Sequence, residues 1–504
     1  MLLLDKIREE RLIRLAMSHF RPDLTPAEFK VLHDSASSED IPKPDEKAPR
    51  PEVRAEFLRW LATDPDAVSQ IDPKGLRVHS AIIPGELDLQ ECHIDLTLVF
   101  RNCDFQRRIN LRSAEMRGLF FLDSTLAEGI RADRVIVHGP LYLRRIESGG
   151  EICLLNARIE CNLDCFGAKL KAEGDALSAD GAKIGGAVFL KNSFESQGTI
   201  RLPGAEIAKD LSFKGAKVAG VVCQNTVVNG DLIWQRIEKS ESTRLNLVGA
   251  KVRNLRDDRR SWPEKEMLDL DGLVYEDLTL HGPLSDEDIK YQTYTDELPL
   301  IAKERIDWIM LQSRECRTEP QPWMQLRDLL ERKSDRKGAK YVLFRFRCLQ
   351  AQKSWIPWRS CRKLYAWIEE NPLRIGWSIA LTLLIGTSIF TWGGWQHAMI
   401  ETVRYQPNAI KENGEVKPVS PHYPKYQPFV YTLENAVPLV KLGMDDKWTP
   451  DPSPDFCRPW FPRKPWLYFI STYGILVFTR WALIVGGWIQ ATILAASVAD
   501  RFKK

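Results

Sequence analysis

The stretch LDLQECHI (87–94) is followed by LVFRNCDF (98–105) and INLRSAEM (109–116), and the three segments share one pattern. Each reads apolar, any, apolar, two of any kind, small, any, apolar. Further copies are ICLLNARI (152–159), LDCFGAKL (163–170), LSFKGAKV (211–218) and LNLVGAKV (245–252). Units begin at 87, 98, 109, 119, 130, 141, 152, 163, 177, 188, 200, 211, 221, 232 and 245, so most intervals are 11 residues. A fixed period of this kind predicts a repeat architecture.

A period of 11 residues is compatible with a right-handed helical supercoil or with stacked strands. Glycine recurs at unit boundaries and corners, where it would destabilise a long helix (Gly85, Gly139, Gly150, Gly185 and Gly230). Within each unit the apolar residues alternate as they do in strands. The fold class we expect is therefore mainly β with α, built on a right-handed parallel β-helix over residues 71–284. Two units form a coil of roughly 22 residues, so fifteen units form seven to eight coils.

The segments on either side of the repeat have helical spacing. Residues 1–70 predict an N-terminal helical cap, with a capping box from Thr25 to Glu28 and an amphipathic helix in PEVRAEFLRWLAT (51–63).

A charged insertion (254–266) interrupts the repeat, and its DDRR (257–260) is interpreted as a solvated loop. Residues 285–372 predict a basic helical connector with a helical hairpin at 323–332 and 339–351. From residue 327 to 374 there are 13 Lys and Arg against five Asp and Glu.

The composition of the whole chain hides a difference between its two ends. The 504 residues are 44% hydrophobic, and their formal charge of +3 is too small to indicate a nucleic-acid-binding protein. Eleven of the 16 Trp nevertheless fall at or after Trp355. Residues 375–396 carry no charge and are long enough to cross a hydrocarbon core of about 30 Å. We expect this first span to place Trp392 and Trp395 at the far interface.

A second apolar region is divided by Arg480. One helix through residues 466–499 would be about 51 Å long, which exceeds what the core requires. Because an Arg in the core is unfavourable, we expect Arg480 and Trp481 at the interface and a second span over 481–499. Residues 373–504 are thus interpreted as a membrane region. Basic flanks predict that both termini and the β-helix are cytosolic.

Residues 397–465, between the spans, contain 12 of the 30 Pro and are predicted to lie outside the cytosol. The apolar piece FVYTLENAVPLVKL (429–442) is either an interfacial helix, which we favour, or a re-entrant half-helix of the kind found in two-span channels. In the second case Glu434, Asp445 and Asp446 are the carboxylates available for cation selection. The sequence contains no potassium-filter motif.

Five stretches together resemble one family. They are RAEFLRWLAT (54–63), GLRVHSAIIPGELDL (75–89), PQPW (320–323), FVYTLENAVPLVKLGMDDKWTP (429–450) and WALIVGGWIQATILAA (481–496). In order and over nearly the whole chain, they resemble a bacterial family of two-span membrane proteins with a pentapeptide-repeat-like or bactofilin-like β-helix. The resemblance implies a location in the bacterial inner membrane and implies no activity.

These features favour a non-enzymatic, membrane-anchored sensor or platform whose β-helix binds a protein or ligand. Its spans are candidates for assembly, as a homo-oligomer, into a channel or pore, and glycines suited to close helix packing are present in both spans (Gly376, Gly386, Gly393, Gly394, Gly486 and Gly487). The alternative is a structural scaffold that assembles through the β-helix, ranked lower because helical segments flank both of its ends. The expected partners are the lipid bilayer and further copies of the chain, and no nucleic acid.

An enzyme is the least favoured interpretation. The sequence has no G-x-G-x-x-G motif and no metal-ligand cluster, so we assign no catalytic, cofactor-binding or metal-binding residue. His93 adjoins Cys92 but takes the outward position of its strand, which argues against a Cys/His nucleophile pair. Cys92 and Cys103 occupy the small position of the repeat and are predicted to be buried.

Overall fold

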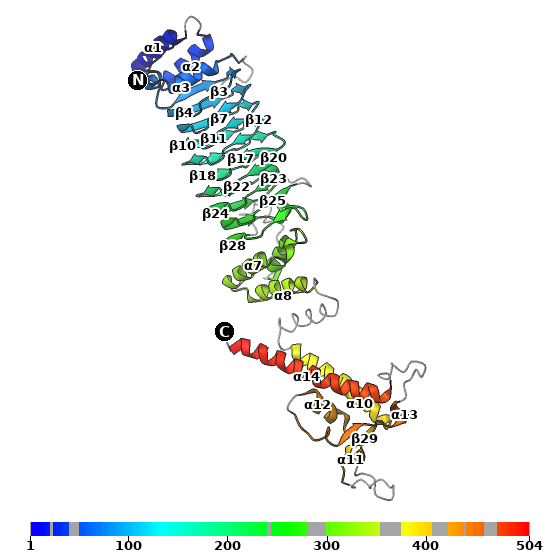
Figure 1. Ribbon diagram of the computed structural model, residues 1–504. Helices are drawn as coiled ribbons and strands as arrows, with labels where there is room; N and C mark the ends of the chain where they lie inside the picture. The colour runs from blue at the N-terminus through cyan, green and yellow to red at the C-terminus, as the bar shows by residue number, and fades with distance from the viewer. Residues whose placement is uncertain are drawn as a thin grey trace, which may run out of the picture. The chain divides into compact units, whose positions relative to one another are not determined.

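The computed structural model describes residues 2–20, 24–39, 50–238, 243–279, 299–352, 374–405, 422–437, 440–457 and 471–502. The chain forms two compact units, Met1–Phe346 and Arg347–Lys504. The first contains parallel strands with helices before and after them, and the second contains two long apolar helices and shorter elements (Figure 1). The predicted boundary at residue 284 lies outside the described residues. So do parts of the predicted basic connector (285–298 and 353–372) and of the Pro-rich segment (406–421, 438–439 and 458–465).

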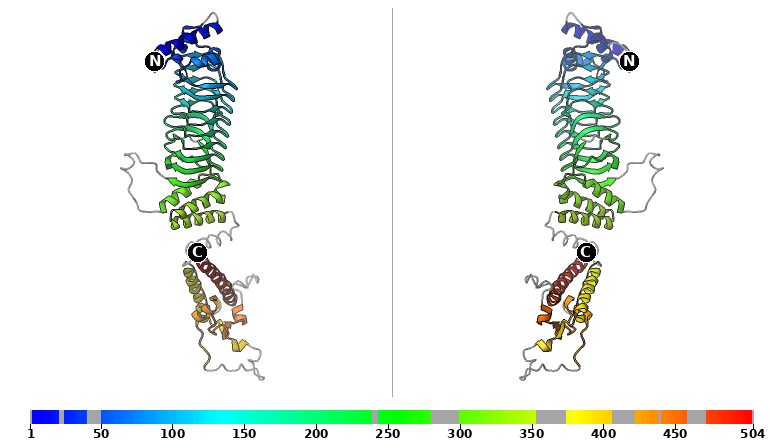
Figure 2. Two further views of the ribbon diagram at one scale, coloured as in Figure 1. Left: turned by 90° about the vertical axis from the view of Figure 1, so that its left-hand side faces the viewer. Right: turned by 90° about the vertical axis from the view of Figure 1, so that its right-hand side faces the viewer.

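The repeat forms two 14-stranded sheets whose pairings are parallel. One sheet contains β1 (Leu76–His79), β4 (His93–Arg101), β7 (Glu115–Leu122), β10 (Ile136–Val137), β11 (Leu141–Arg144), β14 (Arg158–Ile159), β15 (Leu163–Asp164), β18 (Lys183–Ile184), β19 (Val188–Phe189), β21 (Glu206–Ile207), β22 (Leu211–Ser212), β24 (Val227–Trp234), β26 (Lys251–Asp257) and β28 (Val274–Thr279). The other contains β2 (Ile82–Ile83), β3 (Leu87–Asp88), β5 (Asp104–Phe105), β6 (Ile109–Asn110), β8 (Thr125–Leu126), β9 (Ile130–Arg131), β12 (Glu147–Ser148), β13 (Ile152–Cys153), β16 (Lys169–Leu170), β17 (Asp175–Ser178), β20 (Glu195–Arg201), β23 (Lys217–Val222), β25 (Arg244–Asn246) and β27 (Leu268–Asp269). The predicted parallel β-solenoid is confirmed, and Figure 2 shows its stacked turns.

One inward position shows how the turns stack. Leu76 pairs with Leu98, and the series continues in register through Leu119, Leu141, Leu163, Val188, Leu211, Leu232, Leu255 and Leu278. All ten side chains are buried, so each turn adds one aliphatic rung to the core. The solenoid has about nine turns. The sequence predicts fewer because it counts from residue 87, whereas β1 and β2 precede that residue and β27 and β28 follow the last regular unit.

A corner with left-handed backbone ends each half-turn and explains the 11-residue period. Positive φ recurs at residues 80, 91, 102, 113, 123, 134, 145, 156, 167, 181, 192, 204, 215, 225, 236, 249 and 272. Glycine adopts this conformation without a Cβ clash. At Gly181 (φ 68°) a Cβ would lie 2.5 Å from Oδ1 of Asn156, which is a corner of the adjacent turn. The small position of the repeat follows most of these corners, whereas Val135, Ile146, Ile237 and Leu273 occupy it at four of them. Cys103 is fully buried there as predicted, whereas Cys92 is only half-buried.

The described residues before the solenoid form α1 (Leu2–His19), α2 (Pro26–Ala36), α3 (Ala55–Thr63) and α4 (Pro65–Gln70). The predicted capping box begins α2, since the side chains of Thr25 and Glu28 each accept the other's backbone N–H. In α3 the apolar stripe is buried as the pattern predicts (Phe57, Leu58, Trp60 and Leu61). The helix packs against β3 and β4 of the first turns.

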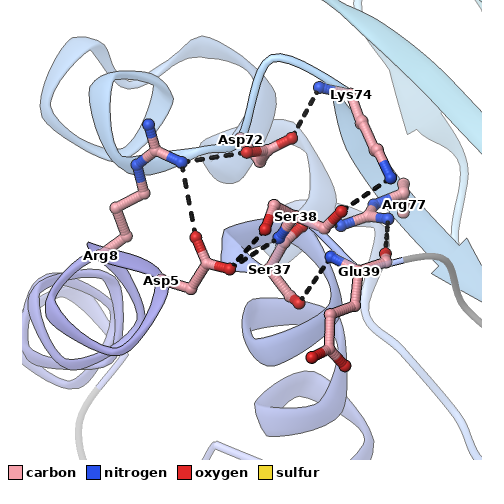
Figure 3. A network of polar contacts seen from close by, with 8 residues as sticks. All are labelled: Asp5, Arg8, Ser37, Ser38, Glu39, Asp72, Lys74 and Arg77. Carbon is pink, nitrogen blue, oxygen red and sulfur yellow. Dashed lines mark hydrogen bonds and ion pairs between the residues drawn. The ribbon is translucent and has the colours of Figure 1, made fainter. Parts of the chain in front are cut away.

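A polar network joins α1 and the end of α2 to the start of the solenoid (Figure 3). Arg8 Nη1 donates to Oδ2 of Asp72 at 3.0 Å, and Ser38 Oγ donates to Oδ2 of Asp5 at 2.6 Å. Arg77 of β1 donates from Nη1 to the carbonyl oxygen of Glu39 at 2.8 Å. Because these contacts link residues far apart in sequence, they fix the helices to the first strand.

The solenoid is followed by α6 (Pro299–Ile309), η2 (Cys316–Thr318), α7 (Pro320–Arg332) and α8 (Arg336–Gln352). Side-chain amides of α7 bond backbone groups of the last turn. Gln321 accepts from the N–H of Gly272 at 3.1 Å and donates to the carbonyl of Leu273 at 2.8 Å. Gln325 donates to the carbonyl of Tyr275 at 2.8 Å. These amides satisfy polar groups that would otherwise require another strand.

The charged insertion differs from its prediction. Residues 254–257 continue β26, and the side chain of Asp257 is 2% exposed rather than part of a solvated loop. Asp257 accepts from Nη1 of fully buried Arg305 at 2.6 Å and from Trp262 Nε1 at 3.0 Å. Asp258 caps η1 (Arg259–Ser261). The solvated-loop interpretation is wrong for Asp257 because its partner, Arg305 of α6, is 48 residues away in the sequence.

The second unit is built on α10 (Arg374–Trp395) and α14 (Thr472–Phe502). The shorter helix α12 (Pro428–Ala436) contacts both of them (Figure 1). β29 (Met399–Glu401) pairs antiparallel with β30 (Trp448–Pro450). The remaining short helices are α11 (Thr402–Tyr405) and α13 (Pro454–Cys457).

In the described part of the chain, two helices are long and apolar enough to cross a membrane, judged by length and composition, over Gly376–Trp395 and Thr472–Thr492. The first agrees with the predicted span at 375–396. The second begins nine residues before the predicted start at 481, because α14 continues without a break through Arg480. The first residues of the apolar region 466–499, namely 466–470, lie outside the described part of the chain.

Candidate functional site

The two long helices run antiparallel and approach each other closely. A Cβ on Gly393 would lie 2.7 Å from the side chain of Leu476. Further along the pair, Gln490 Nε2 donates to Oγ1 of Thr382 at 3.0 Å. Residue numbers fall in α10 as they rise in α14, so the end of α10 lies beside the start of α14. A small residue at the contact permits this close approach, as in helix pairs within membranes.

α12 extends along this helix pair to about its middle. The methyl group of Thr432, halfway along α12, lies 2.6 Å from where a Cβ of Gly386 would stand. The carbonyl oxygen of Ala436, the last residue of α12, lies 1.9 Å from a Cβ placed on Gly487. Gly487 is 15 residues beyond the start of α14, which corresponds to about 22 Å along its axis. The close contacts at Gly386 and Gly487 therefore place α12 alongside the apolar segments of both long helices, Gly376–Trp395 and Thr472–Thr492.

Arg480 is held by residues of α12 and of the segment that follows it. Its Nη2 donates to Oδ2 of Asp445 at 2.9 Å, and its Nε donates to Oδ1 of Asn435 at 3.3 Å. Asn435 Nδ2 in turn donates to Oδ1 of Asp445 at 3.2 Å. Arg480 and Asp445 are 31% and 28% exposed. Arg480 lies within the apolar segment Thr472–Thr492, and its ion pair with Asp445 offsets the cost of a charge there, so α14 continues through it. The predicted role of Arg480 as an interface anchor stays a prediction.

Glu434 closes the turn after α12. Its carboxylate accepts the backbone N–H groups of four consecutive residues, 442–445, at 2.8–3.1 Å. Gly443, within that turn, has φ 77°. Two of the three predicted pore carboxylates, Glu434 and Asp445, are thus engaged within the chain, whereas Asp446 is exposed. The structure brings Glu434 and Asp445 to one turn, as their proximity in sequence suggests.

Asn435 and Tyr431 also belong to this cluster, although no sequence motif marks them. Tyr431 is fully buried and packs edge-on against Phe390 of α10, with ring centroids 4.8 Å apart. Asn435 lies 45 residues from Arg480 in the chain. Its only sequence signal is a polar residue in the apolar run 429–442, because nothing local identifies so distant a partner.

The outward surfaces of α10 and α14 are apolar and exposed. The side chains of Trp377 and Trp395 are 78% exposed, and that of Trp481 is 63% exposed. Trp392 is half-buried and lines an open groove of about 680 Å³ with other residues of α10 and Phe429 (Ala380, Leu383, Leu384, Thr387, Ser388, Thr391 and Trp395). Large apolar side chains in such numbers are typical of a surface that contacts lipid or another protein.

Among the described residues of the solenoid, no cysteine is hydrogen-bonded to a histidine. Burial raises the pKa of the Cys103 thiol to about 12, so it stays protonated at neutral pH. His93 is exposed as predicted, and its Nδ1 lies 3.2 Å from Glu115, which also contacts His138 at 2.8 Å. Hydrogen bonding to Glu115 and Glu160 raises the pKa of His138. Over the described residues, no group of three or more His, Cys, Asp or Glu is arranged to hold a metal ion.

Comparisons with models of protein families, with curated proteins and with solved structures found no match.

Proposed function

We propose that the protein is a non-enzymatic, membrane-anchored platform in which α10 and α14 span the bilayer and the solenoid presents a binding surface. The observation that carries this proposal is the exposure of large apolar side chains along both long helices, where water would be an unfavourable solvent. Two antiparallel spans place both ends of the membrane unit on one side. The basic residues that flank them favour the cytosolic side of a bacterial inner membrane.

The solenoid is the part proposed to bind an unidentified protein or ligand. A stack of turns offers extended faces, and regular solenoids commonly bind partners along such faces. Charged side chains on these faces pair between adjacent turns, as in Arg117 with Asp95 at 2.6 Å and Lys183 with Glu206 at 3.2 Å. We further propose right-handed winding, which parallel crossovers strongly prefer. The flanking helices are proposed to act as caps that prevent end-to-end assembly, which ranks the scaffold alternative lower.

The second candidate function is a channel formed by a homo-oligomer. The packing of α12 against both α10 and α14 favours it. A short helix held between two spans is the arrangement of a re-entrant half-helix. This reverses the preference for an interfacial helix in the sequence analysis. Because Glu434 and Asp445 are engaged within the chain, a carboxylate ring for cation selection depends on Asp446. Two spans cannot enclose a water path alone, so conduction requires several copies.

Extraction and assembly measurements separate these proposals. An anchored chain stays with the membrane in an alkaline carbonate wash and is released by mild detergent; release by carbonate alone contradicts the anchor. Light scattering of the detergent-solubilised protein then measures the number of copies. A strict monomer without conductance in planar bilayers contradicts the channel and leaves the anchor intact. The resemblance to the two-span bacterial family is likewise a proposal, in accord with both functions.

A further inference from the structure

α8 is a helix without an acidic residue, and one of its faces is fixed against the rest of the first unit. Its sequence, RKGAKYVLFRFRCLQAQ, contains five Lys and Arg and no Asp or Glu. Ala339, Val342 and Phe346 are buried, and the Phe346 ring packs on Trp323 of α7 with centroids 5.7 Å apart. Since a helix advances about 100° per residue, these three side chains define its inner face.

The opposite face of α8 is basic with an aromatic residue at its centre. Relative to Val342, Lys340 lies about 160° around the helix axis, and Arg336 and Phe344 lie on either side of it. Phe344 is half-exposed. Four cations of α8 are exposed and have no ion-pair partner among the described residues (Arg336, Lys337, Lys340 and Arg345). On the solenoid, by contrast, acidic and basic side chains are interspersed and pair between turns.

We propose that this outer face of α8 binds the headgroups of anionic phospholipids in the leaflet from which the first span emerges. The inference rests on the proposed membrane anchor and adds a second contact to it. Lys and Arg near an anionic leaflet are attracted to its phosphates, and an aromatic side chain among them enters the interface. Gln352, the last residue of α8, precedes Arg374 of α10 by 22 residues, so even a fully extended chain limits their separation to about 80 Å.

Charge alone would also suit nucleic acid, but two observations favour lipid. Phe344 gives the centre of the face an apolar group that a phosphate backbone does not require. The chain also continues from α8 into an apolar helix long enough to span a membrane. Nucleic acid therefore serves as the competing outcome of the test.

The test compares the full chain in nanodiscs of phosphatidylcholine alone with discs containing one third phosphatidylglycerol. An amine-acylating reagent, read by mass spectrometry, measures the modification rate at Lys337 and Lys340. The controls are Lys209 and Lys251, which are exposed on the solenoid. We expect phosphatidylglycerol to slow acylation of the α8 lysines at least about threefold, to leave the controls unchanged, and to lose this effect in 0.5 M salt, where the Debye length is only about 4 Å. Equal rates in both discs overturn the proposal.

Variants separate the α8 contact from a general effect of charge. Arg336→Gln with Arg345→Gln keeps both reporter lysines and is expected to bring the ratio of rates close to one, because each charge contributes roughly a fivefold preference for the anionic surface. Arg131→Gln with Arg158→Gln removes two exposed solenoid arginines and should leave the ratio unchanged. Protection by added duplex DNA or RNA in neutral discs, without protection by phosphatidylglycerol, would replace lipid with nucleic acid as the partner.

Membrane anchoring and the α8 contact are measured by different readouts. Co-elution of the chain with disc lipid on a sizing column reports anchoring, whereas the lysine rates report the α8 contact. A chain that elutes without lipid contradicts the anchor, and the lysine rates are then compared on vesicles of the same two compositions. Equal rates there also overturn the α8 proposal.

Discussion

Arg480 of α14 and Asp445, which follows α12, form an ion pair in which Nη2 and Oδ2 are 2.9 Å apart. The pair joins an arginine within the apolar segment Thr472–Thr492 to a carboxylate 35 residues earlier in the chain. It holds in place the turn that Glu434 closes and, through Asn435, the end of α12. An arginine that would be unfavourable in a lipid-facing helix thereby becomes the contact that fixes the intervening segment.

Removal of either partner should loosen α12. We expect Arg480→Leu or Asp445→Asn to lower the stability of the membrane unit by about 1–2 kcal/mol, which is less than for a fully buried pair because both side chains are about one third exposed. The double variant should lose less than the sum of the two. Thermal unfolding of the full chain in detergent measures the three values. Strict additivity would show that the pair contributes nothing.

Adjacent glycines in α14 offer a matched comparison. A Cβ on Gly487 would lie 1.9 Å from the carbonyl oxygen of Ala436, whereas a Cβ on Gly486 would have no neighbour within 4 Å. We expect Gly487→Ala to displace α12 and to destabilise the unit by about 1–3 kcal/mol. Gly486→Ala should be neutral or slightly stabilising. The hydrogen-exchange rates of residues 428–436 in the full chain measure the displacement of α12. Equal rates in both variants would argue against the close contact of α12 with Gly487.

The buried ion pair in the first unit should respond more strongly. Because Asp257 and Arg305 are almost fully buried, Asp257→Asn leaves an uncompensated guanidinium and is expected to destabilise the end of the solenoid by about 3–5 kcal/mol. Glu276→Gln, which removes an exposed carboxylate 3.9 Å from Arg253, should change the free energy of unfolding by less than about 0.5 kcal/mol. Hydrogen exchange of β26 and β28 measures both. A small effect at Asp257 would mean that α6 is not fixed by this pair.

Acid should loosen the first turn through His79. Burial, with nearby Arg101 and Arg77, lowers the pKa of His79 to about 4, and neither ring nitrogen has a hydrogen-bond partner among the described residues. The unfolded chain binds a proton near pH 6.5, but the folded chain binds it only near pH 4. Stability is therefore lost as the pH falls through this window, by about 3 kcal/mol in total. His79→Leu should remove the dependence. Exchange of β1 amides at pH 7 and pH 4.5, corrected for intrinsic rates, tests it, and an unchanged pH response in the variant would contradict it.

How far sequence patterns predict this structure depends on how local each signal is. The corner and the small position recur every 11 residues, so the solenoid and the burial of Cys103 follow from the sequence. The apolar run 375–396 likewise predicts α10. The pairings of Arg305 with Asp257 and of Arg480 with Asp445 connect residues 48 and 35 positions apart. Without a known partner a charged residue is expected to be solvated, which is why Asp257 is predicted in a solvated loop. For the same reason the sequence does not predict the ion pair of Arg480 with Asp445.

Thiol accessibility in spheroplasts tests the anchored platform most directly. Cys161 is exposed on the solenoid, Cys457 is half-buried in the segment between the spans, and Asp446→Cys adds an exposed reporter to that segment. We expect a membrane-impermeant maleimide to label residues 446 and 457 in intact spheroplasts and to label Cys161 only after permeabilisation. Labelling of Cys161 in intact spheroplasts, with residues 446 and 457 protected, would contradict the cytosolic solenoid. Equal access to both sites would contradict the two spans.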